Sequence, residues 1–135
     1  MTDIVDRATR SRMMAGIRSK NTKPELLVRS WLHRRGFRFR LHGAGLPGRP
    51  DLVFKQYRAV VFVHGCFWHR HTRCRYATTP ASNPAFWQSK FAANTARDLK
   101  VRRELRQLGW RVHVLWECQI GNQRKLERLA AGLRA

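Results

Sequence analysis

Apolar and polar positions along this chain predict several short strands. The apolar runs at residues 52–54 and 59–63 flank a polar turn at 55–58, and together they predict a β-hairpin. Residues 37–41 alternate apolar and basic side chains, as a half-buried strand does. Another apolar run predicts a further strand at 110–117.

Two shorter helices are predicted, one before and one after these strands in the sequence. Thr22 and Glu25 have the spacing of a capping box, so a helix should begin here. It should run to about Arg35, and Gly36 ends it. A short basic helix is expected at about residues 123–133. For Glu25 two interpretations stay open, because the side chain either only caps the helix or has a catalytic role.

The longest predicted helix begins at Asn83, an N-cap followed by proline, and runs to about Leu108 before Gly109. Steps of three and four residues place its inner stripe on Trp87, Phe91, Asn94, Asp98, Val101, Leu105 and Leu108. Asn94 and Asp98 therefore lie on the apolar side, where unpaired polar groups are costly. They either form satisfied hydrogen bonds in the core or are delivered by this helix to an active site.

The order of these elements predicts one α/β domain over residues 1–135, without an internal repeat or a linker. No apolar run is long enough to cross a bilayer, and residues 1–7 lack the apolar core of a signal peptide. We therefore expect a cytoplasmic location.

The charge of the chain is strongly one-sided. It has 28 Lys and Arg against 8 Asp and Glu, a formal net charge of +20. Nucleic acid is the favoured partner of such a surface, ahead of a membrane surface or a merely Arg-rich composition. Residues 1–20 are basic, with Met13, Met14 and Ile17 as their largest apolar group, so they form either a DNA-contacting arm or a frayed terminus.

Three cysteines, an odd number, argue against a disulfide framework in a reducing compartment and indicate metal binding. Cys66, His71, Cys74 and Cys118 supply three thiols and one imidazole, the donors that structural Zn²⁺ prefers. His71 is preferred as the histidine because it makes a compact chelate with Cys74. Other histidines remain alternatives, namely His42, His64 and His69, and a buried thiol cluster without metal is a further one.

Asp51 and His69 are the candidates for chemistry. Asp51 stands at the start of a strand, after a Gly/Pro-rich loop that lets a phosphate approach the backbone, so it either binds a divalent cation or only forms a turn. His69 adjoins the candidate zinc turn, and a neutral imidazole takes a proton from water at physiological pH. Phe67 and Trp68 should point out of this turn, where they are suited to wedge between base pairs.

Several stretches of the sequence together resemble the very short patch repair endonuclease family, and the similarity covers nearly the whole chain. The run from His64 to His69 is highly specific. The stretches are residues 8–11, 46–51, 64–69, 86–87, 108–112 and 116–118. The resemblance implies a Mg²⁺-dependent enzyme that nicks DNA 5′ of the thymine in T·G mispairs left by deamination of 5-methylcytosine. It also implies a restriction-endonuclease-like mixed central sheet flanked by helices, with a structural zinc site. The expected partner is double-stranded DNA with a T·G mismatch, bound by a monomer, with mismatch-repair proteins as candidate further partners.

The resemblance also assigns roles to residues. Asp51 and the backbone carbonyl of Val63 match the Mg²⁺ ligands, and His69 matches the general base. The polar residues that match positions around the metal waters and the base are Glu25, His64, Asn94 and Asp98. The residues that match zinc ligands are Cys66, His71, Cys74 and Cys118. The residues that match those entering the DNA helix beside the mispair are Met14, Phe67, Trp68 and Trp87.

The sequence departs from the resemblance at a few positions. The wider nuclease superfamily has an acid and a lysine where this chain has Phe62 and His64, which leaves Asp51 as the main protein carboxylate on the metal. Some family members have a run of histidines after His69, whereas this chain has Arg70, Thr72 and Arg73, and the spacing to Cys74 is shifted by one residue in such an alignment. Two alternatives remain: a matched-site restriction-type nuclease and a non-catalytic zinc-containing module that binds nucleic acid.

Overall fold

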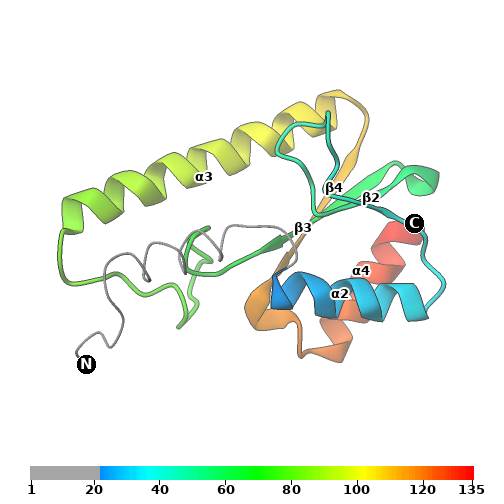
Figure 1. Cartoon of the computed structure of the whole chain (residues 1–135), viewed down its shortest axis with the longest axis horizontal. Coiled ribbons are helices and arrows are strands. Elements are labelled where there is room, and N and C mark those ends of the chain that lie inside the picture. Colours follow the sequence, from blue (N-terminus) through cyan, green and yellow to red (C-terminus); the bar gives the residue numbers. More distant parts are fainter. Residues whose placement is uncertain (1–21) are drawn as a thin grey trace.

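A mixed β-sheet lies at the centre of the computed structural model, which describes residues 22–135 (Figure 1). Its strands are β1 (Arg40–Leu41), β2 (Leu52–Phe54), β3 (Ala59–His64) and β4 (Arg111–Trp116), in that spatial order. The pairs β1–β2 and β2–β3 are antiparallel, and β3–β4 is parallel. The last pair needs a crossover connection, which the long helix α3 (Pro84–Gln107) provides. The predicted α/β class with a mixed sheet is therefore confirmed.

The predicted hairpin forms as β2 and β3, with Leu52 opposite Val61. Its turn is a short 3₁₀ helix, Lys55–Tyr57, closed by Arg58 in the left-handed conformation. The prediction of a strand over residues 37–41 was wrong in extent, since only Arg40–Leu41 pairs. Phe37 does not continue the strand because its N–H binds the carbonyl of Leu32 and so ends the preceding helix.

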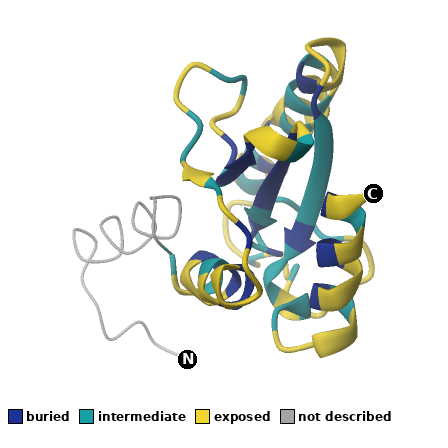
Figure 2. Cartoon of the chain, turned by 90° about the vertical axis from the view of Figure 1, so that its right-hand side faces the viewer, coloured by how far each residue is buried: buried dark blue, intermediate teal, exposed yellow. Residues whose placement is uncertain are grey.

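Two helices cover one face of the sheet and α3 covers the other (Figure 1). Helix α2 spans Lys23–Arg34 and helix α4 spans Gln123–Arg134, close to the predicted bounds. Successive residues of a strand point to opposite faces. Val61 accordingly packs toward α2 and α4, and Val60 packs with Leu105 of α3. Figure 2 shows β2 and β3 largely buried, β4 half-buried, and the helices buried on the sides that face the sheet.

Helix α3 extends past the sheet and over the segment that follows β3 (Figure 1). Phe91, Asn94 and Leu105 are buried on its inner side, as predicted. Leu108 was wrongly placed on the inner stripe, because it lies after the helix and is 54% exposed. Asn83 precedes the helix but makes no capping hydrogen bond, since its left-handed backbone turns the side chain away from that role.

Residues 1–20, the predicted DNA-contacting arm with Met14, lie outside the described part of the chain. Among residues 22–135 no helix is both long enough and apolar enough to cross a membrane.

Candidate active site and metal cluster

Asp51 lies directly before β2, where the antiparallel pairing with β3 brings it beside Val63. Its Oδ2 atom accepts a hydrogen bond of 2.7 Å from the N–H of Val63. Burial raises the pKa of Asp51 to about 7; the Val63 hydrogen bond opposes this shift, and the adjacent carboxyl of Glu25 adds to it. Two neighbouring carboxylates that are buried from solvent repel each other, so either a proton or a cation between them is favoured.

Glu25 reaches this position from the first turn of α2. Thr22 Oγ1 accepts a hydrogen bond from the backbone N–H of Glu25, so Thr22 caps the helix as predicted, but the Glu25 side chain does not complete the capping box. The carboxyl group is only 2% exposed and faces inward. Its Oε2 atom lies 3.0 Å from His42 Nε2 and 3.1 Å from an Nη atom of Arg29. Glu25 is therefore more than a cap, because its carboxyl group joins α2 to the loop that leads to Asp51.

His42 is a member of this acidic group that the sequence did not single out except as an alternative zinc ligand. Its backbone N–H binds the carbonyl of Asp51 at 3.0 Å, and its ring faces Glu25. A left-handed backbone, with φ of 51°, points the ring in this direction. One weak signal in the sequence could have indicated this role of His42. His42 and Asp51 stand at the two ends of the Gly/Pro-rich loop, and the ends of a closed loop lie close together.

His69 is held by a carboxylate from α3. Its Nδ1 atom lies 2.6 Å from Asp98 Oδ2, and its side chain is 28% exposed. An imidazole nitrogen that faces a carboxylate is kept as the N–H donor, which leaves Nε2 to accept a proton. The helix thus pairs Asp98 with His69, and delivery of Asp98 to an active site stays a prediction.

His64, the last residue of β3, stacks on His69 with 3.8 Å between ring centroids and 5° between planes. Burial lowers the pKa of His64 to about 3, and the neighbouring His69 contributes in the same direction. His64 is therefore neutral at physiological pH. Its Nδ1 atom has no hydrogen-bond partner within residues 22–135.

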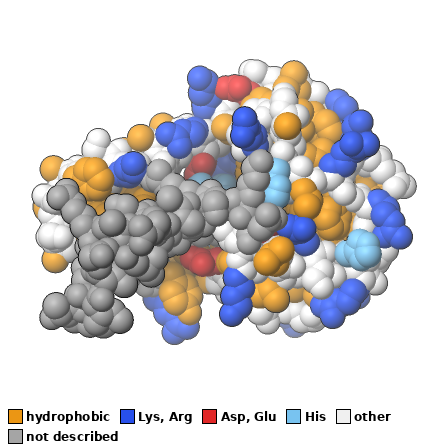
Figure 3. Space-filling view, viewed as in Figure 1, with side chains coloured by type: hydrophobic (Ala, Val, Ile, Leu, Met, Phe, Trp, Pro, Cys, Tyr) orange, Lys and Arg blue, Asp and Glu red, His pale blue; other side chains and the backbone are white. Residues whose placement is uncertain are grey.

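The carboxyl end of β3 links the acid and the imidazole. Asp51 binds the N–H of Val63, and the next residue, His64, stacks on His69. Val63 and His64 therefore lie between two groups with different chemistry. One is a carboxylate able to hold a cation, and the other is an imidazole able to take a proton. Figure 3 shows Lys and Arg side chains spread over the face of the molecule seen in Figure 1, with few acidic side chains among them.

Asn94 makes a different contact from Asp98. It is buried on α3, and its Nδ2 atom donates to the carbonyl of Trp68 at 3.3 Å. Arg97 donates to the Asn94 side-chain oxygen at 3.4 Å. Asn94 thus joins the turn that carries Trp68 to α3. This contact is the satisfied core hydrogen bond that one of the two interpretations of Asn94 expected.

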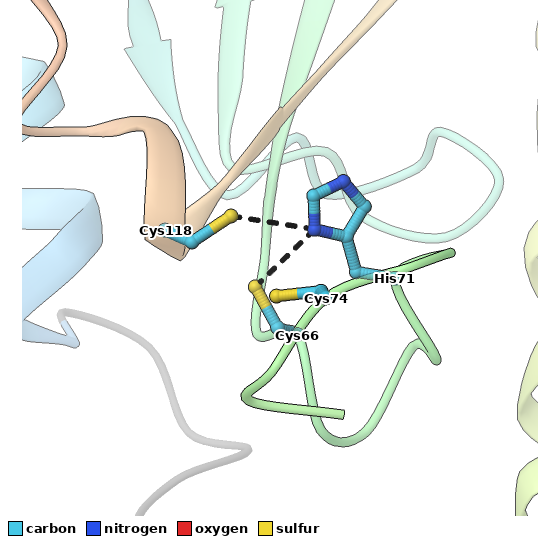
Figure 4. A group of neighbouring side chains, drawn as sticks. All are labelled: Cys66, His71, Cys74 and Cys118. Atoms are coloured by element: carbon cyan, nitrogen blue, oxygen red, sulfur yellow. Dashed lines mark hydrogen bonds between the residues drawn. The ribbon is translucent and has the colours of Figure 1, made fainter. Parts of the chain in front are cut away.

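Cys66, His71, Cys74 and Cys118 form a compact cluster (Figure 4). One ligand atom from each of the four lies within 4.8 Å of those of the others. His71 Nδ1 is 3.7 Å from Cys66 Sγ and 3.3 Å from Cys118 Sγ. Tetrahedral zinc, with bonds of about 2.3 Å to sulfur and about 2.0 Å to nitrogen, separates such donors by roughly 3.5 Å. The four side chains therefore fit a zinc ion, and Cys74 belongs to the group despite its shifted spacing.

The surroundings of the cluster also favour a cation. Burial raises the pKa of the Cys66 thiol to about 12, so the thiolate needs a positive charge beside it. Glu117 accepts a hydrogen bond of 2.9 Å from the N–H of Cys66 and ties the turn to the end of β4. The ring of His71 stacks on Trp116 at 4.2 Å, which fixes its orientation.

The aromatic residues after Cys66 form a cluster with the start of α3. The ring of Phe67 contacts those of Trp68, Trp87 and Phe91 at 5.1, 5.6 and 5.2 Å between centroids. The expectation that Trp68 points out of the turn was wrong, because it is only 7% exposed. Burial against Trp87 is favourable for so large a ring, whereas Phe67 and Trp87 remain partly exposed.

A buried acid and a carboxylate-paired imidazole lie at one end of β3 on a strongly basic α/β chain, which fits a nuclease; the sequence comparisons show the class, an endonuclease. Comparison with known proteins then gives the family. Residues 2–75 match the sequence model of the family described as DNA mismatch endonuclease Vsr. The chain belongs to the Vsr family.

Individual relatives cover most of the chain. The type II nicking enzyme V.XorIIP of Xanthomonas oryzae pv. oryzae is 49% identical over 94% of this chain and 93% of its own length. The type II nicking enzyme V.NmeAIP of Neisseria meningitidis is 46% identical over 91% and 87%. The DNA mismatch endonuclease Vsr of Escherichia coli K12 is 44% identical over 93% and 80%. The resemblance inferred from the sequence, and the conclusion that the chain is an endonuclease acting on DNA, are confirmed.

Proposed function

We propose that this chain nicks one strand of DNA at T·G mispairs, on the 5′ side of the thymine, by Mg²⁺-dependent hydrolysis. The observation that carries the proposal is the 2.6 Å pair of His69 and Asp98 beside the residues that hold Asp51. The names of the relatives, a mismatch endonuclease and nicking enzymes, support a reaction on one strand. The restriction-endonuclease-like arrangement of the sheet is part of this proposal.

The acidic group provides the donors that Mg²⁺ prefers. Asp51 and the carbonyl of Val63 would hold the ion, and Glu25 would orient water bound to it. These hard oxygen donors fit the ion, and burial together with the neighbouring carboxyl of Glu25 raises the pKa of Asp51 to about 7, an unfavourable environment for the carboxylate that a cation would relieve. When bound, Mg²⁺ polarises the scissile phosphate and stabilises the departing 3′ oxygen. His42 and Arg29 hold Glu25 in place.

His69 acts as the general base. The carboxylate of Asp98 keeps the Nδ1 proton in place, so Nε2 receives the proton of the attacking water. The stacked ring of His64 restricts the rotation of His69 without adding a positive charge beside it, because burial lowers the pKa of His64 to about 3. The base is thereby positioned before DNA binds.

The zinc cluster has a structural role in this proposal. Zn²⁺ held by Cys66, His71, Cys74 and Cys118 closes the turn that carries His69 and the aromatic residues. All four donors are used, and structural zinc sites leave no open position for a reacting water. The cluster therefore positions side chains and takes no part in hydrolysis.

The aromatic cluster recognises the mispair. Phe67 and Trp87, both partly exposed, are the rings that would enter the DNA helix, and the buried Trp68 supports them. A mispair is already weakly stacked, so inserting a ring there costs less than at a matched step. The basic surface supplies affinity that does not depend on sequence and falls with salt.

A nicking assay tests the proposal directly. The wild-type protein is incubated with end-labelled duplexes that differ only in one T·G or T·A pair, in several flanking contexts, with and without added Mg²⁺. We expect one cut, 5′ of the thymine, only in the T·G duplex and only with Mg²⁺. Equal cutting of both duplexes would instead support a matched-site nuclease, and binding without any cut would support a non-catalytic zinc module.

A further inference from the structure

Arg70, between the candidate base and a candidate zinc ligand, directs its side chain back across its own loop. Its backbone is left-handed, with φ of 52°. One Nη atom donates to the carbonyls of Thr78 and Phe67, at 2.8 and 3.4 Å. The other donates to the carbonyl of Ala77 and to Thr79 Oγ1, both at 3.0 Å. The guanidinium group therefore joins the turn that carries Phe67 to the segment 77–79.

The same guanidinium group lies over an aromatic ring of α3. The Arg70 Cζ atom is 4.0 Å from the centroid of the Phe91 ring and 5.8 Å from that of Phe67. Phe91 also contacts Phe67 edge-on. A cation above an aromatic ring is attracted to it, and the planar guanidinium stacks there while its edge forms hydrogen bonds. One side chain thus connects three segments around the Phe67 ring.

We propose that Arg70 is a positioning residue for mismatch recognition, which acts by holding Phe67 at the angle needed to enter the DNA helix. This inference rests on the proposed function. Arg70 does not serve as a phosphate contact, because its Nη atoms are engaged by Phe67, Ala77, Thr78 and Thr79. Its positive charge therefore matters less than its planar, forked shape.

Lysine keeps the charge but lacks this shape. Its ammonium group donates from a single point and cannot lie flat on Phe91 while reaching both Ala77 and Thr78. Arg70→Lys is therefore the informative variant. Arg73→Lys is the matched control, since Arg73 is in the same loop, also has a left-handed backbone (φ 58°) and has an exposed guanidinium with no hydrogen-bond partner within residues 22–135.

The experiment measures the ratio of binding to T·G and matched duplexes for the wild type, Arg70→Lys and Arg73→Lys. A 2-aminopurine base beside the mispair reports insertion of the ring by its fluorescence. We expect Arg70→Lys to lower the ratio roughly 5- to 20-fold and the fluorescence change with it, the size expected when charge-assisted hydrogen bonds are lost. Affinity for the matched duplex and its salt dependence should stay unchanged, because the net charge is unchanged. Arg73→Lys should behave as the wild type.

Zinc content and the melting temperature of each variant show whether the turn remains closed. If Arg70→Lys fails to fold, Thr79→Val removes one of the four hydrogen bonds and should give a smaller change in the same direction. A wild-type ratio with intact zinc in both variants would overturn the role of Arg70, and so would equal losses on both duplexes. A wild-type protein that itself shows no preference for T·G would overturn the proposed function as well.

Discussion

Two groups of potential metal ligands lie at the same edge of the sheet, and they are built differently. The sulfur-rich cluster already has its donors at zinc spacing, with His71 Nδ1 at 3.7 and 3.3 Å from two sulfurs. The acidic group instead has one carboxyl, Asp51, whose pKa is raised to about 7 by burial and which lies beside a second, Glu25. The first group has the donors and the spacing of a structural zinc site. In the second group burial favours a proton on Asp51, so we expect a cation to bind there in competition with that proton.

The largest effect should come from removing the acid. Asp51→Ala should lower the nicking rate at least about 10³-fold, because the main metal carboxylate is lost, while DNA affinity stays within about a few-fold. Single-turnover nicking and gel-shift titration measure the two quantities. Arg73→Lys serves as the control for general effects of mutation. Nicking at the wild-type rate by Asp51→Ala would show that the acidic group is not the catalytic metal site.

Next in size should be the effect of removing a sulfur. Cys66→Ser should reduce bound zinc below one ion per chain and lower the free energy of unfolding by about 3 kcal/mol or more. The reason is that the four ligands close one turn onto the end of β4. Metal analysis and urea unfolding provide the measurement. Glu117→Gln, which keeps all four ligands, should retain its zinc, and full zinc content in Cys66→Ser would remove the distinction between the two groups.

The smallest effect concerns pH. Because the pKa of Asp51 is raised from 3.8 to about 7, folding favours the protonated acid. Its contribution to stability is complete below about pH 4 and is lost as the pH rises through 7. In zinc-loaded protein without Mg²⁺, Asp51→Asn should therefore be more stable than the wild type by about 1–3 kcal/mol at pH 8, and by less at pH 6. Urea unfolding at the two pH values tests this, and a pH-independent difference would contradict it.

Sequence patterns predicted the parts of this molecule that local chemistry determines. The hairpin, the helix that begins after Thr22 and the long α3 follow from apolar spacing and capping residues. The grouping of Cys66 with distant Cys118 followed from the count and type of donors, and the structure brings them together. These predictions needed no knowledge of how side chains pack.

Other features depend on packing between distant segments, which spacing alone does not determine. The pairing of His42 with Glu25 arises because a loop folds back on α2. Trp68 is buried rather than exposed because α3 brings Trp87 over it. The guanidinium of Arg70 meets Phe91 for the same reason, although the sequence around it is simply basic. In each case the sequence shows the residue itself but does not predict which distant residue it contacts.

The parallel pairing of β3 with β4 determines when the candidate catalytic turn can close during synthesis. Both strands end at the same edge of the sheet, with Trp116 opposite His64, so Cys118 completes the cluster that begins at Cys66. A nascent chain whose β4 is still inside the ribosome tunnel has the imidazole and the acid but not the last sulfur. An unfinished chain therefore lacks one of the four donors, and we expect the turn to close only after β4 has left the ribosome.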